Sequence, residues 1–290
     1  NNGGTITKLT SDFISNIVNL NRIFVYGGGL IGNYTYSLSE PSSEPSSELL
    51  SSSVIGDIIG NFISNTITGN FVYGGGLVGN YSYTLSHTSS KLLSSSLIGD
   101  VIGDFVSNAV TINEYLHGGG LISNYSCADS NSQGSSSTMR NITADFISNS
   151  VTVNINLYGG GLIGNYTYAG NVTSSLSTMG NITANFISNS VTIDSVEGGG
   201  LIGNFSYTYS DSSNPSCKSS STIGDITGDF ISNNVTISED NVYGGGLIGN
   251  YTYTSSGTSS LSTIEDITGD FISNNVTINS TLYGGGLISN

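Results

Sequence analysis

The sequence predicts an all-β fold, a parallel β-helix solenoid, and three observations support this prediction. The chain of 290 residues repeats itself seven times, with a period of about 43 residues. Its regular segments are rich in Ile, Val, Thr, Tyr and Phe and are interrupted by Gly and Asn, without the 3.6-residue period of a helix. Only 9% of its residues are charged and 40 are glycine. This composition suits stacked copies of one short unit.

Two motifs define each repeat, a Phe-x-Ser-Asn segment and a triple glycine that follows 12 to 14 residues later. The first motif starts at Phe13, Phe62, Phe105, Phe146, Phe186, Phe230 and Phe271. The triple glycine starts at Gly27, Gly74, Gly118, Gly159, Gly198, Gly244 and Gly284. From each triple glycine to the next Phe is 27 to 35 residues. The variation in length therefore falls in the Ser-rich segment after the glycines.

The two motifs are similar to each other when Phe230 is aligned with Leu247 and Asn233 with Asn250. We interpret each repeat as two half-repeats that form one coil each, which predicts about two coils per repeat. About fourteen coils would make a rod of roughly 65 Å at the usual strand spacing. The whole chain, 1–290, is then one β-helix domain, which we interpret as a segment of a longer or polymerising chain.

Stacked coils place equivalent residues in columns, and the sequence predicts what each column does. A column of asparagines can hydrogen-bond along the axis, whereas a column of charges would repel. Asn also tolerates left-handed φ, which suits the turn between strands. The predicted Asn ladder consists of Asn16, Asn65, Asn108, Asn149, Asn189, Asn233 and Asn274. We expect Phe to stack inside, and the glycines to form a bend or to let coils approach closely.

The alternation of Phe-Ile-Ser-Asn (Phe146 to Asn149) with Gly-Gly-Gly-Leu-Ile (Gly159 to Ile163) has a known counterpart. It resembles the repeat pair of the chlamydial polymorphic outer-membrane proteins, which also occurs in surface proteins of some protists. The resemblance covers nearly the whole chain, although Gly stands where the family usually has Ala. It implies a right-handed β-helix that is exposed on a cell surface and is often adhesive.

Twelve Asn-x-Ser/Thr sequons are candidates for N-glycosylation. They are Asn33, Asn80, Asn124, Asn141, Asn165, Asn171, Asn181, Asn204, Asn234, Asn250, Asn275 and Asn279. Six of them follow a triple glycine, and there the hydroxyl residue is never replaced by Val or Ile. Those six suit either glycans or an interior Asn ladder beside a hydroxyl column. Of the others, Asn234 and Asn275, with Asn141, Asn171 and Asn181, are expected to carry glycans in a eukaryotic host. This predicts a secreted, extracellular or cell-surface glycoprotein.

The Ser-rich segments and the cysteines leave alternatives open. Residues 37–53 form a low-complexity run that suits O-glycosylation or a plain flexible loop. Cys127 and Cys217 are expected in variable loops two repeats apart. An intramolecular disulfide, an interchain disulfide and free thiols are all compatible with that placement.

Residues that could carry chemistry are sparse. Asp pairs four residues apart, such as Asp100/Asp104, Asp225/Asp229 and Asp266/Asp270, are expected to be turn residues, with Ca²⁺ binding as the minority alternative. The two histidines lie in different segments without catalytic partners, so the sequence predicts no enzyme and no cofactor. Five Lys and Arg against twenty Asp and Glu exclude nucleic acid as a partner. No apolar run reaches the roughly 18 residues of a membrane span.

Tyrosines recur in pairs after the triple glycine, as in Tyr34/Tyr36 and Tyr251/Tyr253. Such pairs predict two aromatic columns, which either pack against the long loop or form a stripe for sugar binding or self-association.

Two functions follow from the sequence. The first is a structural glycoprotein whose coils stack end to end into an extracellular filament or surface appendage. The second is an adhesin that binds host or matrix ligands through its Ser-rich loops.

Overall fold

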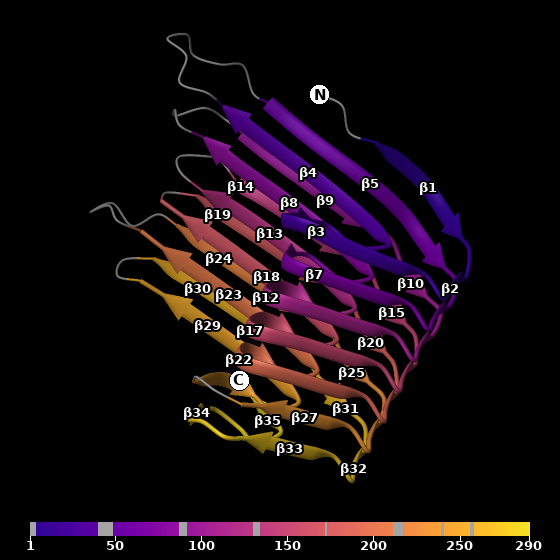
Figure 1. Cartoon of the computed structure of the whole chain (residues 1–290). Coiled ribbons are helices and arrows are strands. Elements are labelled where there is room, and N and C mark those ends of the chain that lie inside the picture. Colours follow the sequence, from indigo (N-terminus) through magenta and orange to yellow (C-terminus); the bar gives the residue numbers. More distant parts are fainter. Residues whose placement is uncertain are drawn as a thin grey trace.

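The computed structural model describes residues 4–39, 49–86, 92–129, 134–171, 173–210, 217–238, 241–255 and 258–290. In these residues the regular structure is entirely β, and every strand pair is parallel (Figure 1). The strands form four sheets, A to D, that run along the stack, which confirms the predicted parallel β-helix. No helix in the described residues is long and apolar enough to cross a membrane.

The chain passes through the four sheets in the same order in every repeat. Sheet A contains β1 (Thr5–Thr10), β5 (Leu49–Ile59), β9 (Leu92–Ile98), β10 (Val101–Ile102), β14 (Gly134–Met139), β15 (Ile142–Thr143), β19 (Ser174–Met179), β20 (Ile182–Thr183), β24 (Lys218–Ile223), β25 (Ile226–Thr227), β30 (Ser259–Ile264) and β31 (Ile267–Thr268). Sheet B contains the two-residue strands β2 (Phe13–Ile14), β6 (Phe62–Ile63), β11 (Phe105–Val106), β16 (Phe146–Ile147), β21 (Phe186–Ile187), β26 (Phe230–Ile231) and β32 (Phe271–Ile272).

The other two sheets lie on either side of the triple glycine. Sheet C precedes it and contains β3 (Ile17–Tyr26), β7 (Thr66–Tyr73), β12 (Ala109–Gly119), β17 (Ser150–Gly160), β22 (Ser190–Gly199), β27 (Asn234–Ile237), β28 (Val242–Gly245), β33 (Asn275–Ile278) and β34 (Leu282–Tyr283). Sheet D follows it and contains β4 (Ile31–Ser39), β8 (Val78–Ser86), β13 (Ile122–Asp129), β18 (Ile163–Gly170), β23 (Ile202–Tyr209), β29 (Ile248–Thr254) and β35 (Ile288–Ser289).

Each repeat forms one coil, so the prediction of two coils per repeat is wrong. Phe105 pairs in register with Phe62 on one side and with Phe146 on the other, one whole repeat away in each direction. The half-repeats are similar because both place an apolar residue and an Asn inside, but they occupy different sides of the same coil. Seven coils at the usual strand spacing extend roughly 30 Å, about half of the predicted length.

The first buried region, which we call the apolar prism, lies between sheets B and C and the part of sheet A next to sheet B. In the fourth coil it is filled by Met139, Ile142, Phe146, Val151 and Val153, which are all buried. The phenylalanines of sheet B stack along the axis with ring centroids 4.5 to 5.0 Å apart and planes within 8° of parallel. This region corresponds to the expected interior of a β-helix.

The second buried region, which we call the hydroxyl blade, lies between sheet D and the first part of the sheet A strands. Its side chains are small and polar: Ser82, Ser94, Ser135 and Ser137 are all buried there. Ser82 Oγ and Ser94 Oγ are 2.7 Å apart, and Ser135 Oγ donates to Ser82 Oγ at 2.9 Å. The Ser-rich segments after the glycines therefore do not lie wholly in loops. Many of their serines belong to sheet A strands, and their side chains point into the blade between sheets A and D.

The predicted Asn ladder is present at the turn between sheets B and C. Asn149 Nδ2 donates to Asn189 Oδ1 at 3.0 Å and to the Phe105 carbonyl at 2.7 Å, and the other members repeat this pattern. The left-handed residue at this turn is the serine before each Asn, with φ near +54° at Ser148, rather than the Asn itself. The asparagine stays in the interior because its amide links three successive coils.

The triple glycine meets both of the expected requirements. Gly118 has a φ of +127°, a backbone angle that residues with a side chain rarely adopt. A Cβ at Gly119 would lie 1.9 Å from the Ile122 carbonyl oxygen, and one at Gly120 would lie 2.1 Å from that of Gly161 in the next coil. The bend from sheet C to sheet D therefore excludes side chains at all three positions.

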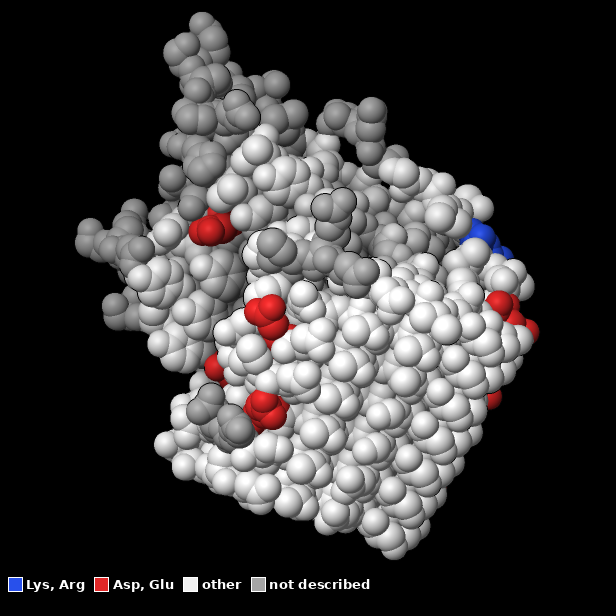
Figure 2. All heavy atoms as spheres, in the orientation of Figure 1, with Lys and Arg blue, Asp and Glu red and all other residues white. Residues whose placement is uncertain are grey.

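Charged residues lie on the outside of the coil. Two columns of Asp and Asn follow the turns on either side of the short second segments of sheet A, and their Oδ1 atoms accept backbone N–H groups of neighbouring coils, as Asp104 Oδ1 does from Asp145 at 3.0 Å. In Figure 2 the acidic side chains in view form small separate groups and leave a broad face over sheet C uncharged. Many of the acidic side chains in the described residues thus lie in two columns along the turns rather than at one site.

Candidate functional surfaces

The six sequons that follow the triple glycine form a second interior Asn ladder, so their assignment as glycosylation sites is wrong for the folded chain. Asn33, Asn80, Asn124, Asn165, Asn204 and Asn250 are all buried. Asn124 Nδ2, the atom that would carry a glycan, donates to Asn165 Oδ1 at 3.1 Å and to the Thr178 carbonyl at 2.7 Å. The hydroxyl residue is buried in the blade in five of these sequons, at Thr35, Ser82, Ser126, Thr167 and Ser206, which explains why Val and Ile do not replace it.

The other six sequons lie at the surface of the coil. Asn141, Asn181, Asn275 and Asn279 are exposed, and Asn171 and Asn234 are half-buried. Asn141 and Asn181 are neighbours in one of the Asp/Asn turn columns, where they lie between Asp100 and Asp225. These positions have room for a glycan, so N-glycosylation there stays a prediction.

Cys127 and Cys217 are buried thiols in the structure. Cys127 lies within strand β13 and not in a loop, and Cys217 directly precedes β24. Burial raises the pKa of the Cys127 thiol well above its ordinary value. The two cysteines therefore do not form the intramolecular disulfide that the sequence left open.

Three aromatic columns face outward where sheets C and D meet. The sheet C column holds Tyr26, Tyr73, His117, Tyr158, Glu197, Tyr243 and Tyr283. The first sheet D column holds Tyr34, Tyr81, Tyr125, Tyr166, Phe205 and Tyr251. The second holds Tyr36, Tyr83, Cys127, Tyr168, Tyr207 and Tyr253. The sequence predicted the two sheet D columns. It did not predict that the residue before each triple glycine would join them as a third.

These columns pack on one another rather than on a loop, because the glycine bend turns the outer faces of sheets C and D towards each other. Tyr73 and Tyr125 lie 6.2 Å apart between ring centroids, across the bend. Tyr81, Tyr125 and Tyr166 of the first sheet D column are buried at the bottom of this elbow. Their phenol pKa values are raised well above the ordinary value, mainly by burial, so their hydroxyl groups stay neutral.

Two titratable side chains interrupt the sheet C column. His117 is stacked between Tyr73 and Tyr158, with centroids 4.5 and 4.7 Å away, and burial lowers its pKa to about 3. Its buried Nδ1 has no hydrogen-bond partner among the described residues. Burial likewise raises the pKa of Glu197 to about 7. Neither side chain has the partner that acid–base catalysis needs, so both are best explained as members of the column.

At one end of the elbow the columns enclose a concave space of about 480 Å³, which we call the aromatic trough. Its lining residues are Tyr26, Tyr34, Tyr36, Tyr73, Tyr81, Tyr83, Tyr125 and Cys127. Tyr26, Tyr34 and Tyr36 are 46%, 43% and 42% exposed, so their rings are accessible. The trough is therefore lined by phenol rings, which are stacked on one another along the axis, and by one thiol, without an acidic or basic side chain.

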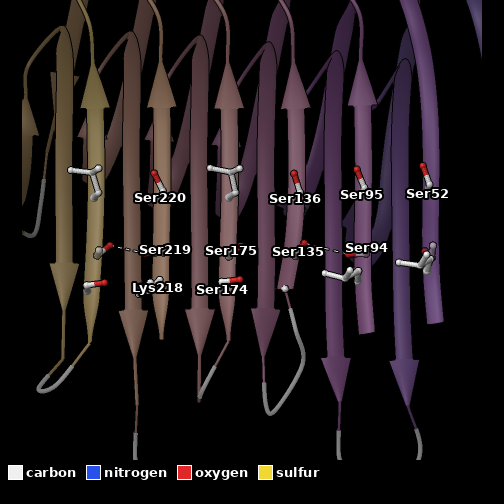
Figure 3. Close-up of a pocket in the computed structure, with 18 residues that line it drawn as sticks. Ser52, Ser94, Ser95, Ser135, Ser136, Ser174, Ser175, Lys218, Ser219 and Ser220 are labelled. Atoms are coloured by element: carbon white, nitrogen blue, oxygen red, sulfur yellow. Dashed lines mark hydrogen bonds between the residues drawn. The ribbon is translucent and has the colours of Figure 1, made fainter. Parts of the chain in front are cut away.

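A second hollow, of about 710 Å³, follows the outer face of sheet A across six coils. Figure 3 shows Ser52, Ser95, Ser136 and Ser220 in one row across successive strands. Leu176 and Leu261 fill the other places of that row, and Lys218 is the one basic side chain among the lining residues. This groove is wide and regular, but its polar groups do not converge on any point.

No group of three or more His, Cys, Asp or Glu that could hold a metal ion occurs among the described residues. The Asp pairs predicted as turn residues do lie at turns, as at Asp100 and Asp104. Of the Ser-rich loops predicted as ligand-binding or O-glycosylated, 40–48, 87–91, 130–133 and 211–216 lie outside the described residues.

Comparisons with known proteins were made for the whole chain. No family model, no curated protein and no solved structure matches it. The resemblance to the polymorphic outer-membrane protein repeats therefore stays a prediction.

Proposed function

We propose that the chain is a structural protein, a β-helical spacer in an extracellular filament or cell-surface appendage. The supporting observation is that the columns continue through all seven coils without a break: the Phe stack, both Asn ladders and the glycine bend recur in each. Enzymes on solenoids need a local departure that gathers reactive groups. Here the departures from regularity are single substitutions, such as His117 and Glu197.

The proposal includes association of chains by coil stacking. Each coil presents to the next the same strand edges and the same column residues that it receives from the coil before, so a second copy can continue the stack. Negative-stain electron microscopy of the native material tests this. Continuous fibres with a regular axial repeat are expected, whereas only isolated rods at every concentration would contradict stacking.

Adhesion is the second candidate, because the largest differences in length fall at one edge, between a sheet D strand and the next sheet A strand. If these connecting segments bind the ligand, their sequences can change to suit different ligands while the coil itself stays unchanged. Rods anchored singly on cells, and loss of cell attachment when the segment 40–48 is replaced by a short Gly-Ser linker, would favour adhesion over a filament.

An extracellular location is part of both proposals, and the accessible sequons offer its test. After secretion from a eukaryotic host, peptide mapping is expected to find glycans at Asn141 and Asn181 and none at Asn124 or Asn165. An intact mass equal to the bare 30.0 kDa would remove the glycoprotein hypothesis.

A further inference from the structure

We propose that the gap in the sheet C aromatic column at Glu197 is a binding site for a small organic cation with a methylated ammonium group. The site belongs to the fourth, fifth and sixth coils, which have a stacked neighbour on both sides. This inference is independent of the filament proposal, since a rod can carry such a site whether or not it polymerises.

The gap exists because a carboxylate stands where the neighbouring coils have a ring. Glu197 pairs in register with Tyr158 on one side and with Tyr243 on the other. Tyr158 stacks on His117 with centroids 4.7 Å apart, and Tyr243 stacks on Tyr283 with centroids 4.9 Å apart. Each of the two tyrosines is thus covered by a ring of its own column on one face only, and the opposite faces turn towards Glu197.

A concave space of about 220 Å³ opens at this gap. Its lining residues are Asn156, Leu157, Tyr158, Ser195, Glu197, Asn241 and Tyr243. The volume is below the roughly 300–1,000 Å³ of sites for drug-sized molecules, so the space suits a ligand of few heavy atoms. Two strand spacings separate Tyr158 from Tyr243, and a cation midway would lie about 4.8 Å from each ring, within the roughly 6 Å range of cation–π attraction.

The Glu197 side chain supplies a negative charge that nothing on the chain balances. No hydrogen bond or ion pair of this carboxylate occurs within the described residues, and burial is the cause that raises its pKa to about 7. Burial, and to a smaller extent the charge of Glu197, raises the phenol pKa values of Tyr158 and Tyr251. No Lys or Arg lines the space. A bound cation would therefore compensate the carboxylate and relieve its effect on the surrounding phenols.

Ring faces beside a carboxylate select a methylated ammonium group over other cations. The faces attract a positive charge through the ring quadrupole, which is how aromatic cages hold quaternary ammonium ligands. Glu197 is the one acidic side chain among the lining residues, so a metal ion would find a single carboxylate where it prefers several oxygen ligands. A methylated ammonium needs no such set of ligands, because its methyl groups pack directly on the rings.

The test compares choline with 3,3-dimethylbutan-1-ol, which has the same shape but carries carbon in place of the charged nitrogen. Titrations are made at pH 8, where Glu197 is mostly ionised, and sodium chloride keeps the ionic strength constant. The chain contains 17 Tyr and no Trp, so its intrinsic fluorescence comes from tyrosine.

Choline is expected to change this fluorescence saturably, with a Kd of about 1 mM or tighter, and calorimetry is expected to give the same affinity. The neutral alcohol should bind at least about tenfold more weakly. Equal binding of both probes would overturn recognition of the charge, and binding of neither would overturn the site.

A matched pair of carboxylate variants locates the charge that is recognised. Glu197→Gln keeps the shape of the side chain and removes its charge, and should weaken choline binding at least about tenfold. Glu265→Gln removes an exposed carboxylate outside the gap, and should change the binding less than about twofold. Equal weakening in both variants would mean that only the net charge of the chain matters, and would overturn the site.

A second pair tests the ring faces. Tyr158 and Tyr73 stack on opposite sides of His117, with centroids 4.7 and 4.5 Å away, but only Tyr158 borders the gap. Tyr158→Leu should weaken choline binding about fivefold or more, and Tyr73→Leu less than about twofold. Equal weakening would contradict a contact with the Tyr158 face.

A conservative variant separates the ring contact from misfolding. Tyr158→Phe keeps the ring and loses only the hydroxyl, so choline should bind within about threefold of the parent. A loss as large as in Tyr158→Leu would overturn the ring face as the contact. Circular dichroism of the variants, with an unchanged β signal, establishes that the coil is intact.

Discussion

The apolar prism and the hydroxyl blade are buried to the same degree but are built from opposite chemistry. The prism packs Phe, Ile and Val, and its stability comes from apolar surface removed from water. The blade buries Ser, Thr and Asn, each of which must find a hydrogen-bond partner there. Only three buried side-chain N or O atoms in the described residues lack a partner: His117 Nδ1, Ser123 Oγ and Ser280 Oγ. The comparison teaches that a polar interior is tolerated when coil stacking supplies every partner at a fixed spacing.

The largest expected effect lies in the prism. Phe146→Ala deletes a ring that is 0% exposed and stacked on both sides, so it should lower the free energy of unfolding by about 3–5 kcal/mol. Urea denaturation followed by circular dichroism measures this. A loss below about 1 kcal/mol would mean that the Phe stack is not what holds the prism together.

The next effect lies at the Asn ladder that borders the prism. Asn149→Ala leaves the Phe105 carbonyl without the Asn149 Nδ2 donor, and it leaves the backbone N–H and Nδ2 of Asn108 without their shared acceptor, Asn149 Oδ1. This loss should cost about 2–3 kcal/mol. The control is Asn113→Ala, which removes an exposed Asn–Asn hydrogen bond of similar length, 2.9 Å to Asn70. That variant should stay within about 0.5 kcal/mol of the parent. If both variants lost a similar free energy of unfolding, the buried Asn ladder would stabilise the fold no more than an exposed Asn–Asn hydrogen bond does.

A smaller effect is expected from the negative charge of Glu197 in the sheet C column, which should lower the stability of the folded chain. The pKa of Glu197 is raised from 4.5 to about 7 in the folded chain, so its neutral form is favoured there. The contribution of Glu197 to stability should therefore be highest below pH 4.5, fall as the pH rises from about 4.5 to 7, and stay constant above that.

Glu197→Gln should remove that fall and stabilise the chain at pH 8 by about 1–2 kcal/mol. Thermal melts at pH 4, 6 and 8 compare the two proteins. Parallel pH profiles of parent and variant would contradict the assignment.

The smallest effect lies in the blade. Ser137→Ala removes a hydroxyl that donates to Asn124 Oδ1 at 2.6 Å, and should cost about 1 kcal/mol. Ser137→Val, which also adds volume between two closely packed sheets, should cost more. If Val proved as stable as Ser, the blade would be an ordinary apolar interface, and the distinction between the two regions would fail.

Much of the fold could be predicted because stacking makes local chemistry repeat. A column of Phe146 and its equivalents must be apolar and a column of Asn149 must be hydrogen-bonded, and both conclusions need only the repeat. The glycine bend was predictable for the same reason, since three adjacent positions without a side chain indicate a conformation or contact that excludes one.

The number of coils per repeat could not be read from the similarity of the half-repeats. Phe146 to Asn149 and Leu162 to Asn165 look alike because each supplies an inward apolar residue and an inward Asn. One signal in the sequence was applied only to the sequons: the residue two positions after Asn165 and its equivalents is always a hydroxyl residue, whereas the aligned residue after Asn149 and its equivalents is Val or Ile. The same signal also bears on the number of coils. Stacked half-repeats would mix them in one column, and only stacked whole repeats keep each column uniform.

The sites were less predictable than the fold. The sequence of a sequon such as that at Asn165 is the same whether its amide faces solvent or another coil. Whether the amide is accessible depends on the sheet that packs over it. The aromatic trough depends on the angle at which sheets C and D meet, which follows from the glycine bend and not from any single residue. Tyr73 and Tyr125, far apart in sequence, therefore gave no sign of their contact across the elbow.

The repeated pairing between coils also has a consequence for how such a gene can change. Every coil contacts its neighbours through the same columns, and the largest differences in length fall in the connections from sheet D to sheet A. Recombination between two tandem repeats would therefore delete or duplicate one complete turn and rejoin surfaces that already fit. The length of the rod could drift by inheritance in steps of about 4.8 Å, with no intermediate that has to pass through a misfolded chain.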